Sequence, residues 1–203
     1  MCHIGAHVPV DHGNGTSLSI NSCIEYNRVA FILPGGMENT LLISLNRAEL
    51  TAKDDWALIW TCVSPFVLKV RGKNDLMKMD VYRQPSAHQK RLFIFTVYYN
   101  HARQSVNDFI YYGTLLLENN YWHELTEAMA FFKDGTLVDL LNRIEVEMRK
   151  SQLATGTVPP ADGVAAASIR SLFKSFLPVT DETLKLIGSD IRKNPTAYFN
   201  VED

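Results

Sequence analysis

The sequence predicts an α+β fold, in which a predominantly antiparallel β-sheet or sandwich of about seven short strands is followed by about four helices. Before residue 118, short segments rich in β-branched and aromatic residues alternate with turn-forming residues, which is typical of strands. After residue 119, apolar residues recur at spacings of three and four, which is typical of helices. A length of 203 residues and a hydrophobic fraction of 46% are ordinary for a globular domain.

The predicted strands differ in their patterns. The Pro-Gly-Gly of "LPGGMEN" predicts a hairpin turn between the second and third strands. "LMKMDVYR" alternates apolar and polar residues and predicts a half-exposed strand, whereas "RLFIFTVYY" is apolar on both faces and predicts a central one. In order, the seven segments are TSLSINSC, NRVAFIL, TLLISLN, FVLKVR, LMKMDVYR, RLFIFTVYY and DFIYYGTLLLE.

The predicted helices follow in the second half of the chain. Asparagine as N-cap and Gly135 as C-cap predict a helix near 121–133, and a stripe of leucines predicts a second helix over 136–153. "VAAASIRSLFKSFL" predicts an amphipathic helix that Pro178 stops. "TDETLKLIGSDIRK" predicts a short last helix capped by Thr180.

Composition divides the chain into four parts. We expect residues 1–15 to form a flexible tail and residues 16–153 to form a single α+β domain. Residues 154–163 contain two prolines and two glycines and predict a linker, which leaves residues 164–203 as a helical C-terminal arm. A hinged apolar helix after such a linker favours exchange between subunits, so we expect a homo-oligomer formed through the arm.

Targeting signals are missing from the sequence. No segment reaches the roughly 20 apolar residues of a membrane span, and the first residues lack the basic start and apolar stretch of a secretory signal. Three cysteines, at positions 2, 23 and 62, do not suggest a disulfide framework. We therefore expect an intracellular, cytoplasmic protein.

Common catalytic motifs are also missing. The sequence has no G-x-S-x-G elbow, no P-loop and no G-x-G-x-x-G. "HELTE", from His123 to Glu127, lacks the second histidine of a zinc-binding H-E-x-x-H helix and predicts an exposed helix face. Cys23 and Cys62 lie among apolar residues, and we expect both to be inert core thiols.

Chemically versatile side chains crowd the N-terminus, where Cys2, His3, His7, Asp11 and His12 occur within a dozen residues. A structural zinc site pairs two close ligands with a second, distant pair, and the sequence offers no such second pair. We therefore expect no metal and no cofactor. The alternative is an enzyme whose site is assembled from residues distant in sequence, such as a Cys/His hydrolase.

The strongest compositional signal is a basic segment. The whole chain has a net charge of -2, but residues 69–103 contain eight basic side chains and only two acidic ones. Such a segment attracts phosphate groups, whether of RNA or of an anionic membrane surface, and tyrosines near it in sequence could stack on bases. The predicted polyanion-binding residues are Lys69, Arg71, Lys73, Lys78, Arg83, Lys90, Arg91 and Arg103.

These features together predict a non-enzymatic assembly or scaffold protein that self-associates and binds a polyanion. Its layout, a basic middle with a helical arm, is similar to that of small viral matrix and nucleocapsid-associated proteins. This is an analogy of layout and not a match of motifs, and function depends on the site that a fold carries.

Overall fold

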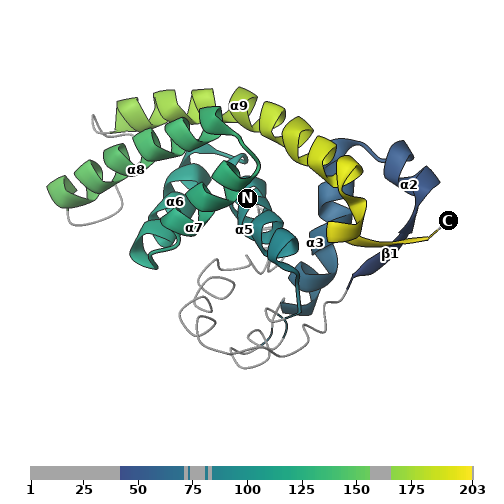
Figure 1. The fold of residues 1–203 in the computed structure, drawn as a ribbon. Coiled ribbons are helices and arrows are strands. Elements are labelled where there is room, and N and C mark those ends of the chain that lie inside the picture. Colours follow the sequence, from purple (N-terminus) through teal and green to yellow (C-terminus); the bar gives the residue numbers. More distant parts are fainter. Residues whose placement is uncertain (1–41, 71–72, 74–80, 82–83, 156–165, 203) are drawn as a thin grey trace, which may run out of the picture.

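A computed structural model describes residues 42–70, 73, 81, 84–155 and 166–202 of the chain. Within these residues the fold is 81% helical (Figure 1). The strands are β1 (Ile43–Asn46) and β2 (Phe199–Glu202), and a short 3-10 turn, η1 (Pro195–Ala197), precedes β2. The helices are α2 (Arg47–Ala52), α3 (Asp55–Val70), α5 (Ala87–Ala102), α6 (Val106–Glu118), α7 (Trp122–Phe131), α8 (Gly135–Thr155) and α9 (Ala166–Lys193).

The predicted antiparallel sheet is wrong, because the described residues contain two strands and these pair in parallel. Of the predicted strands that fall within the described residues, only "TLLISLN" contains one, β1. "FVLKVR" lies mostly at the end of α3, "RLFIFTVYY" lies within α5, and "DFIYYGTLLLE" lies within α6. "TSLSINSC", "NRVAFIL" and nearly all of "LMKMDVYR" lie outside the described residues.

Helix α5 shows why the strand predictions were wrong. It packs against α3, α6 and α7, so no side chain from 88 to 102 is exposed, and its middle, residues 92–99, is a run of apolar and aromatic residues broken only by Thr96. A short apolar run of this kind does not distinguish a buried helix from a central strand. A capping box starts the helix: the Gln89 amide donates to Ser86 Oγ (3.1 Å), and the Ser86 amide donates to Gln89 Oε1 (2.8 Å).

Two of the predicted helices are confirmed. Helix α7 lies within the predicted range 121–133, and α8 covers the predicted range 136–153. Gly135 is not the C-cap of α7, because the chain reverses at Lys133, which has a φ of 59°. Asp134 then caps α8 by accepting a hydrogen bond from the Leu137 amide (2.9 Å).

Helix α9 replaces the two helices predicted on either side of Pro178, so that prediction is wrong. The proline side chain is exposed, and the helix continues through it for 28 residues. Thr180 does not cap a new helix, because its hydroxyl donates back to the Phe176 carbonyl (2.9 Å) within the same one. Tertiary packing along α9 therefore outweighs the hydrogen bond that a proline removes.

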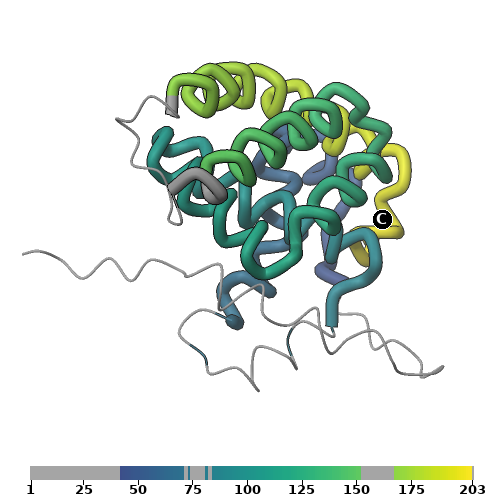
Figure 2. The backbone as a smooth tube through the Cα atoms, turned by 90° about the vertical axis from the view of Figure 1, so that its left-hand side faces the viewer, coloured from purple at the N-terminus to yellow at the C-terminus, as the bar shows by residue number. Residues whose placement is uncertain are grey.

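The position of α9 determines the shape of the molecule. It lies beside α8 along one half and beside α3 along the other (Figures 1 and 2). Phe176, Ile187 and Ile191 are completely or almost completely buried in these contacts. The predicted linker at 154–163 begins within the last turn of α8, and its remaining residues lie outside the described part of the chain.

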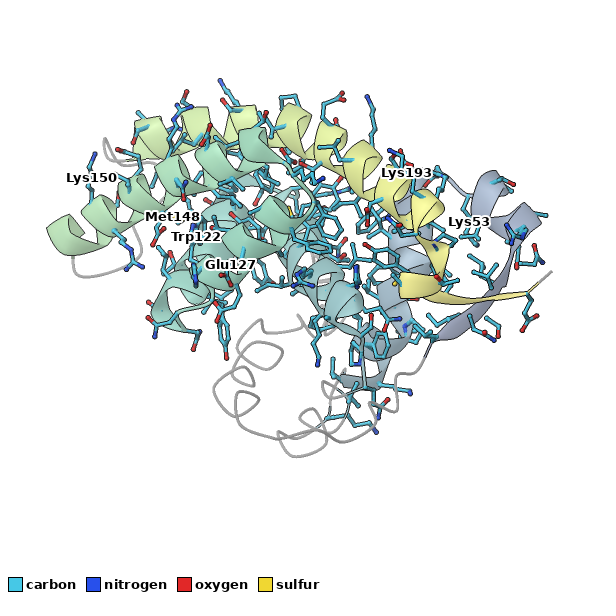
Figure 3. The ribbon with its side chains drawn as sticks, viewed as in Figure 1. Lys53, Trp122, Glu127, Met148, Lys150 and Lys193 are labelled. Carbon is cyan, nitrogen blue, oxygen red and sulfur yellow. The ribbon has the colours of Figure 1, made fainter. Side chains whose placement is uncertain are left out.

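An ion pair and a hydrogen bond, both made by Arg192, join α9 to the junction of α2 and α3. Arg192 donates to Asp55 Oδ1 (2.5 Å) and to the Lys53 carbonyl (2.8 Å). Gly188 permits this approach, because a Cβ added there would lie 2.1 Å from Asp55 Oδ1. In Figure 3, the labelled Lys53 and Lys193 mark this junction.

A second close contact joins α6, α7 and α8. A Cβ added at Gly113 would lie 2.5 Å from Met148 Cε and 3.5 Å from the Trp122 ring. Figure 3 shows Met148 and Trp122 lying next to each other in this part of the core.

No helix of the described residues is both long enough and apolar enough to cross a membrane.

Candidate anion-binding surface

The structure describes five of the eight predicted polyanion-binding residues. Arg71, Lys78 and Arg83 lie outside the described residues. Among the five, Lys69, Lys73 and Arg103 have exposed side chains, and Lys90 and Arg91 have half-buried ones. All five residues lie on α3 or α5 or directly after one of these two helices, so the packing of α3 and α5 determines where they lie.

Helices α3 and α5 run antiparallel, and this separates the basic residues into two groups. The end of α3 meets the start of α5, where Lys69 Nζ donates to Gln84 Oε1 (3.2 Å). Lys73, Lys90 and Arg91 belong to this end by their position in the chain. Arg103 follows the last turn of α5, twelve residues beyond Arg91 or about 18 Å along the helix axis.

Arg103 is engaged in the packing of its own end. Its Nη1 donates to the Tyr99 hydroxyl (2.8 Å), and its guanidinium lies 5.1 Å from the Tyr99 ring and 6.0 Å from the Trp56 ring. The linear basic segment is therefore not one patch. Arg103 contributes to the contact between α3 and α5 and not to the surface that carries Lys69.

Around the start of α5, an arginine stacks on an exposed aromatic ring. The guanidinium carbon of Arg91 lies 4.1 Å from the ring centroid of Phe131, the last residue of α7. His88 approaches the same ring edge-on, with centroids 5.0 Å apart and an interplanar angle of 79°. Phe131 is 38% exposed.

Lys133 adds a basic residue that the sequence analysis missed. It lies two residues after Phe131, in the turn between α7 and α8, and its side chain is exposed. The signal was present in "FFKDG", where a lysine follows two phenylalanines, but it falls outside the basic segment. We define the basic end as Lys69, Lys73, Lys90, Arg91 and Lys133 together with His88 and Phe131.

Acidic groups around the basic end already have hydrogen-bond partners. Asp134 is buried and accepts hydrogen bonds from the Leu137 amide and the Thr183 hydroxyl. Asp190 accepts a hydrogen bond from the Tyr198 hydroxyl (2.5 Å). Burial, together with this hydrogen bond, raises the pKa of that tyrosine. Glu127, one turn before Phe131, lies 3.3 Å from His123 in an exposed pair.

Most of the tyrosines suggested for stacking are unsuitable. Tyr98, Tyr99 and Tyr112 are buried in the core. Tyr111 is 48% exposed but lies on α6, and Tyr82 is outside the described residues. Phe131, which lies far from the basic segment in sequence, provides the exposed ring at the basic end.

Cysteine and histidine chemistry has little support in the described residues. Cys62 is fully buried, and burial raises its pKa to about 12, so it is a neutral thiol at physiological pH. His123 is exposed on α7, as predicted for "HELTE", and burial lowers the pKa of His101. Cys2, Cys23 and the N-terminal histidines lie outside the described residues. Among the residues that are described, no three metal-ligating side chains gather.

Two hollows occur away from the basic end. A groove of about 520 Å³ between α8 and α9 is lined in part by Arg143, Val146 and Ser171. A smaller one of about 280 Å³ lies between α7 and α8, beside Thr126 and Arg149. Both are open to solvent.

Comparisons with protein-family models, with curated proteins and with solved structures found no match. The function is therefore inferred from the chain's own residues.

Proposed function

We propose that the protein is a non-enzymatic assembly or scaffold protein that binds a phosphate-bearing polyanion through its basic end. One observation carries this proposal: Arg91 of α5 lies 4.1 Å from the exposed Phe131 ring, the turn after this ring carries Lys133, and the end of α3, which carries Lys69, meets the start of α5. The neighbouring carboxylates of Asp134 and Asp190 are held by hydrogen bonds, which reduces their competition for these cations. A surface of this kind attracts polyanions by releasing their counterions.

The test is binding across a salt series with two matched double variants. Lys69→Glu/Lys73→Glu changes the charge of the basic end, and Lys174→Glu/Lys193→Glu makes the same change in charge on exposed positions of α9. Binding of the full chain to a 12-nucleotide RNA and to vesicles containing anionic lipid is measured from 50 to 300 mM salt. We expect the first double variant to reduce the slope of log affinity against log salt by about one to two, and the second to leave it unchanged.

Two results would contradict the proposal. Equal losses in the two double variants would mean that net charge, and not the basic end, determines binding. A wild-type affinity that does not change with salt for either ligand would mean that no phosphate contacts are made.

Self-association through residues 164–203 is the second part of the proposal. The buried side of α9 already packs on α8 and α3, so a second copy would contact its remaining surface, where Leu177 and Leu186 flank the buried stripe on opposite sides and are 37% and 45% exposed. We expect Leu177→Glu/Leu186→Glu to lower the mass measured by light scattering. An unchanged mass with an unchanged melting temperature would show that α9 serves its own fold alone.

The alternative of a Cys/His hydrolase has no support from the one cysteine that the described residues contain. Cys62 Sγ lies 3.9 Å from the Tyr198 carbonyl in the core, and the raised pKa disfavours the thiolate that such a reaction requires.

A further inference from the structure

We propose that the polyanion is single-stranded nucleic acid and that one of its bases stacks on the Phe131–Arg91 pair. This inference rests on the proposed function, because the basic end must first attract the phosphates. It adds a contact that phosphate attraction alone does not require, namely a stacking site for an unpaired base.

The orientation of the Phe131 ring is set by its neighbours. His88 and Phe132 pack against it nearly perpendicularly, with interplanar angles of 79° and 81°. The His88 ring is itself supported by Tyr198, 5.3 Å away at 80°. An exposed ring held in this way presents a fixed surface for stacking, so little conformational entropy is lost when a base binds.

Arg91 extends that surface. Within the described residues, its guanidinium donates to the Ala87 carbonyl (3.2 Å) while lying against Phe131. A guanidinium is planar and carries five N–H donors, so it stacks on a base and still has donors for a phosphate. Proteins that bind single strands combine aromatic and arginine stacking with basic side chains in this manner.

Two other polyanions fit the basic end less well. Bases of a duplex are stacked on one another and are not available to a side chain, so a duplex would use the phosphate contacts alone. A membrane surface is commonly bound by a helix with a free apolar face. Most apolar side chains of α3, α5 and α7 are buried in the core, and the exposed Leu68 of α3 and Phe131 of α7 are single residues and not a continuous apolar face.

The experiment compares two probes that differ only in their bases. Fluorescence anisotropy measures binding of the full chain to a 12-nucleotide oligouridine and to an abasic oligomer with the same phosphates. We expect Phe131→Ala to weaken binding of the oligouridine roughly 5- to 100-fold and to leave binding of the abasic oligomer unchanged. Tyr111→Ala, which removes an exposed ring on α6, should leave both affinities unchanged.

A second variant controls for the possibility that Phe131→Ala misfolds. Phe131→Trp keeps a ring at the site, so it should retain oligouridine affinity, and its added fluorescence should be quenched by the oligouridine and not by the abasic oligomer. Melting temperatures of all variants are measured in parallel.

The results separate the two proposals. Equal wild-type affinities for the oligouridine and the abasic oligomer, both dependent on salt, would overturn base stacking and leave the basic end as a phosphate-binding surface. Binding to anionic vesicles without binding to the oligouridine would also overturn base stacking. The absence of salt-dependent binding to any probe would overturn both proposals.

Discussion

The two ends of α5 both place an arginine over aromatic rings, yet they differ in what surrounds the arginine. At the start, Arg91 covers a ring that is 38% exposed, Lys133 follows this ring by two residues, and Lys69 lies at the end of α3 that meets the start of α5. At the far end, Arg103 covers Tyr99 and Trp56, and its Nη1 donates to the Tyr99 hydroxyl. An arginine on an aromatic ring therefore forms part of a candidate binding surface at one end of α5 and a packing contact between α3 and α5 at the other.

This difference shows that a helix can place basic residues of one sequence segment at two separate sites. Two arginines twelve residues apart in one basic segment lie about 18 Å apart along α5, each among different neighbours. We therefore expect substitutions at the far end to change the free energy of unfolding, and substitutions of charged residues at the basic end to change polyanion affinity.

The largest expected effect on stability concerns Gly188, behind the far end of α5. Gly188→Ala would place a Cβ against Asp55, so the contact between α9 and α3 must shift. We expect the free energy of unfolding to fall by about 2–3 kcal/mol, because the atoms in the way belong to a short side chain at a helix start. Urea denaturation followed by circular dichroism measures this fall.

Gly135→Ala is the matched control, since the first residue of α8 has open space around its Cα. We expect it to be neutral or to stabilise by about 0.5 kcal/mol. Equal stabilities for the two variants would show that the close contact at Gly188 does not constrain the fold.

The next effect compares two buried polar residues of α5. Gln89 caps the helix and donates to the Tyr198 carbonyl (3.1 Å), so we expect Gln89→Ala to destabilise by about 2 kcal/mol. Thr96 Oγ1 is buried with no hydrogen-bond partner among the described residues. Thr96→Val should therefore be neutral or should stabilise by up to about 1 kcal/mol. Urea denaturation distinguishes the two, and a destabilised Thr96→Val would reveal a partner for its hydroxyl.

A smaller effect tests the two arginines directly. Arg103→Gln removes the guanidinium from the Tyr99 and Trp56 rings, and we expect a loss of about 0.5–1 kcal/mol with RNA affinity within about twofold of wild type. Arg91→Gln should do the reverse, weakening RNA binding with little change in stability. Urea denaturation and anisotropy, measured on both variants, would contradict the comparison if the two behaved alike.

The smallest effect concerns the exposed pair of His123 and Glu127. Their side chains are 78% and 66% exposed, so Glu127→Gln should change the free energy of unfolding by less than about 0.5 kcal/mol. Because Glu127 precedes Phe131 by one turn, its neutralisation should raise RNA affinity at low salt by less than about twofold. A larger change in stability, measured by the same urea denaturation, would show that this pair contributes to the fold.

Helix α8 could be predicted from the sequence because it has one solvent-facing side. In α8, Leu137, Leu141 and Ile144 form a stripe beside exposed polar residues, and the spacing identifies the helix. Helix α5 has no such polar side, so its spacing carries no signal, and β-branched and aromatic residues favoured a strand. The capping box of Ser86 and Gln89 was the local signal that indicated a helix.

The candidate surface could be predicted only in part. Charge alone singled out Lys69, Lys73 and Arg91, but it could not separate them from Arg103. Arg103 lies at the far end of α5, and the sequence predicts that segment as a strand. Phe131 and Lys133 lie at the end of another helix. Tertiary packing of α7 against α5, which no local pattern encodes, brings Phe131 to Arg91.

The pairing of β1 with β2 has a mechanical consequence. The strands are parallel, with Ile43 opposite Phe199 and Asn46 opposite Glu202, so residue 42 and residue 202 leave the pair at opposite ends. A pulling force applied through these two points acts along the strands and loads their hydrogen bonds together, in shear, instead of opening them one at a time. Under such a force, the hydrogen bonds between β1 and β2 must therefore break before the helices between the two strands in the chain can be separated.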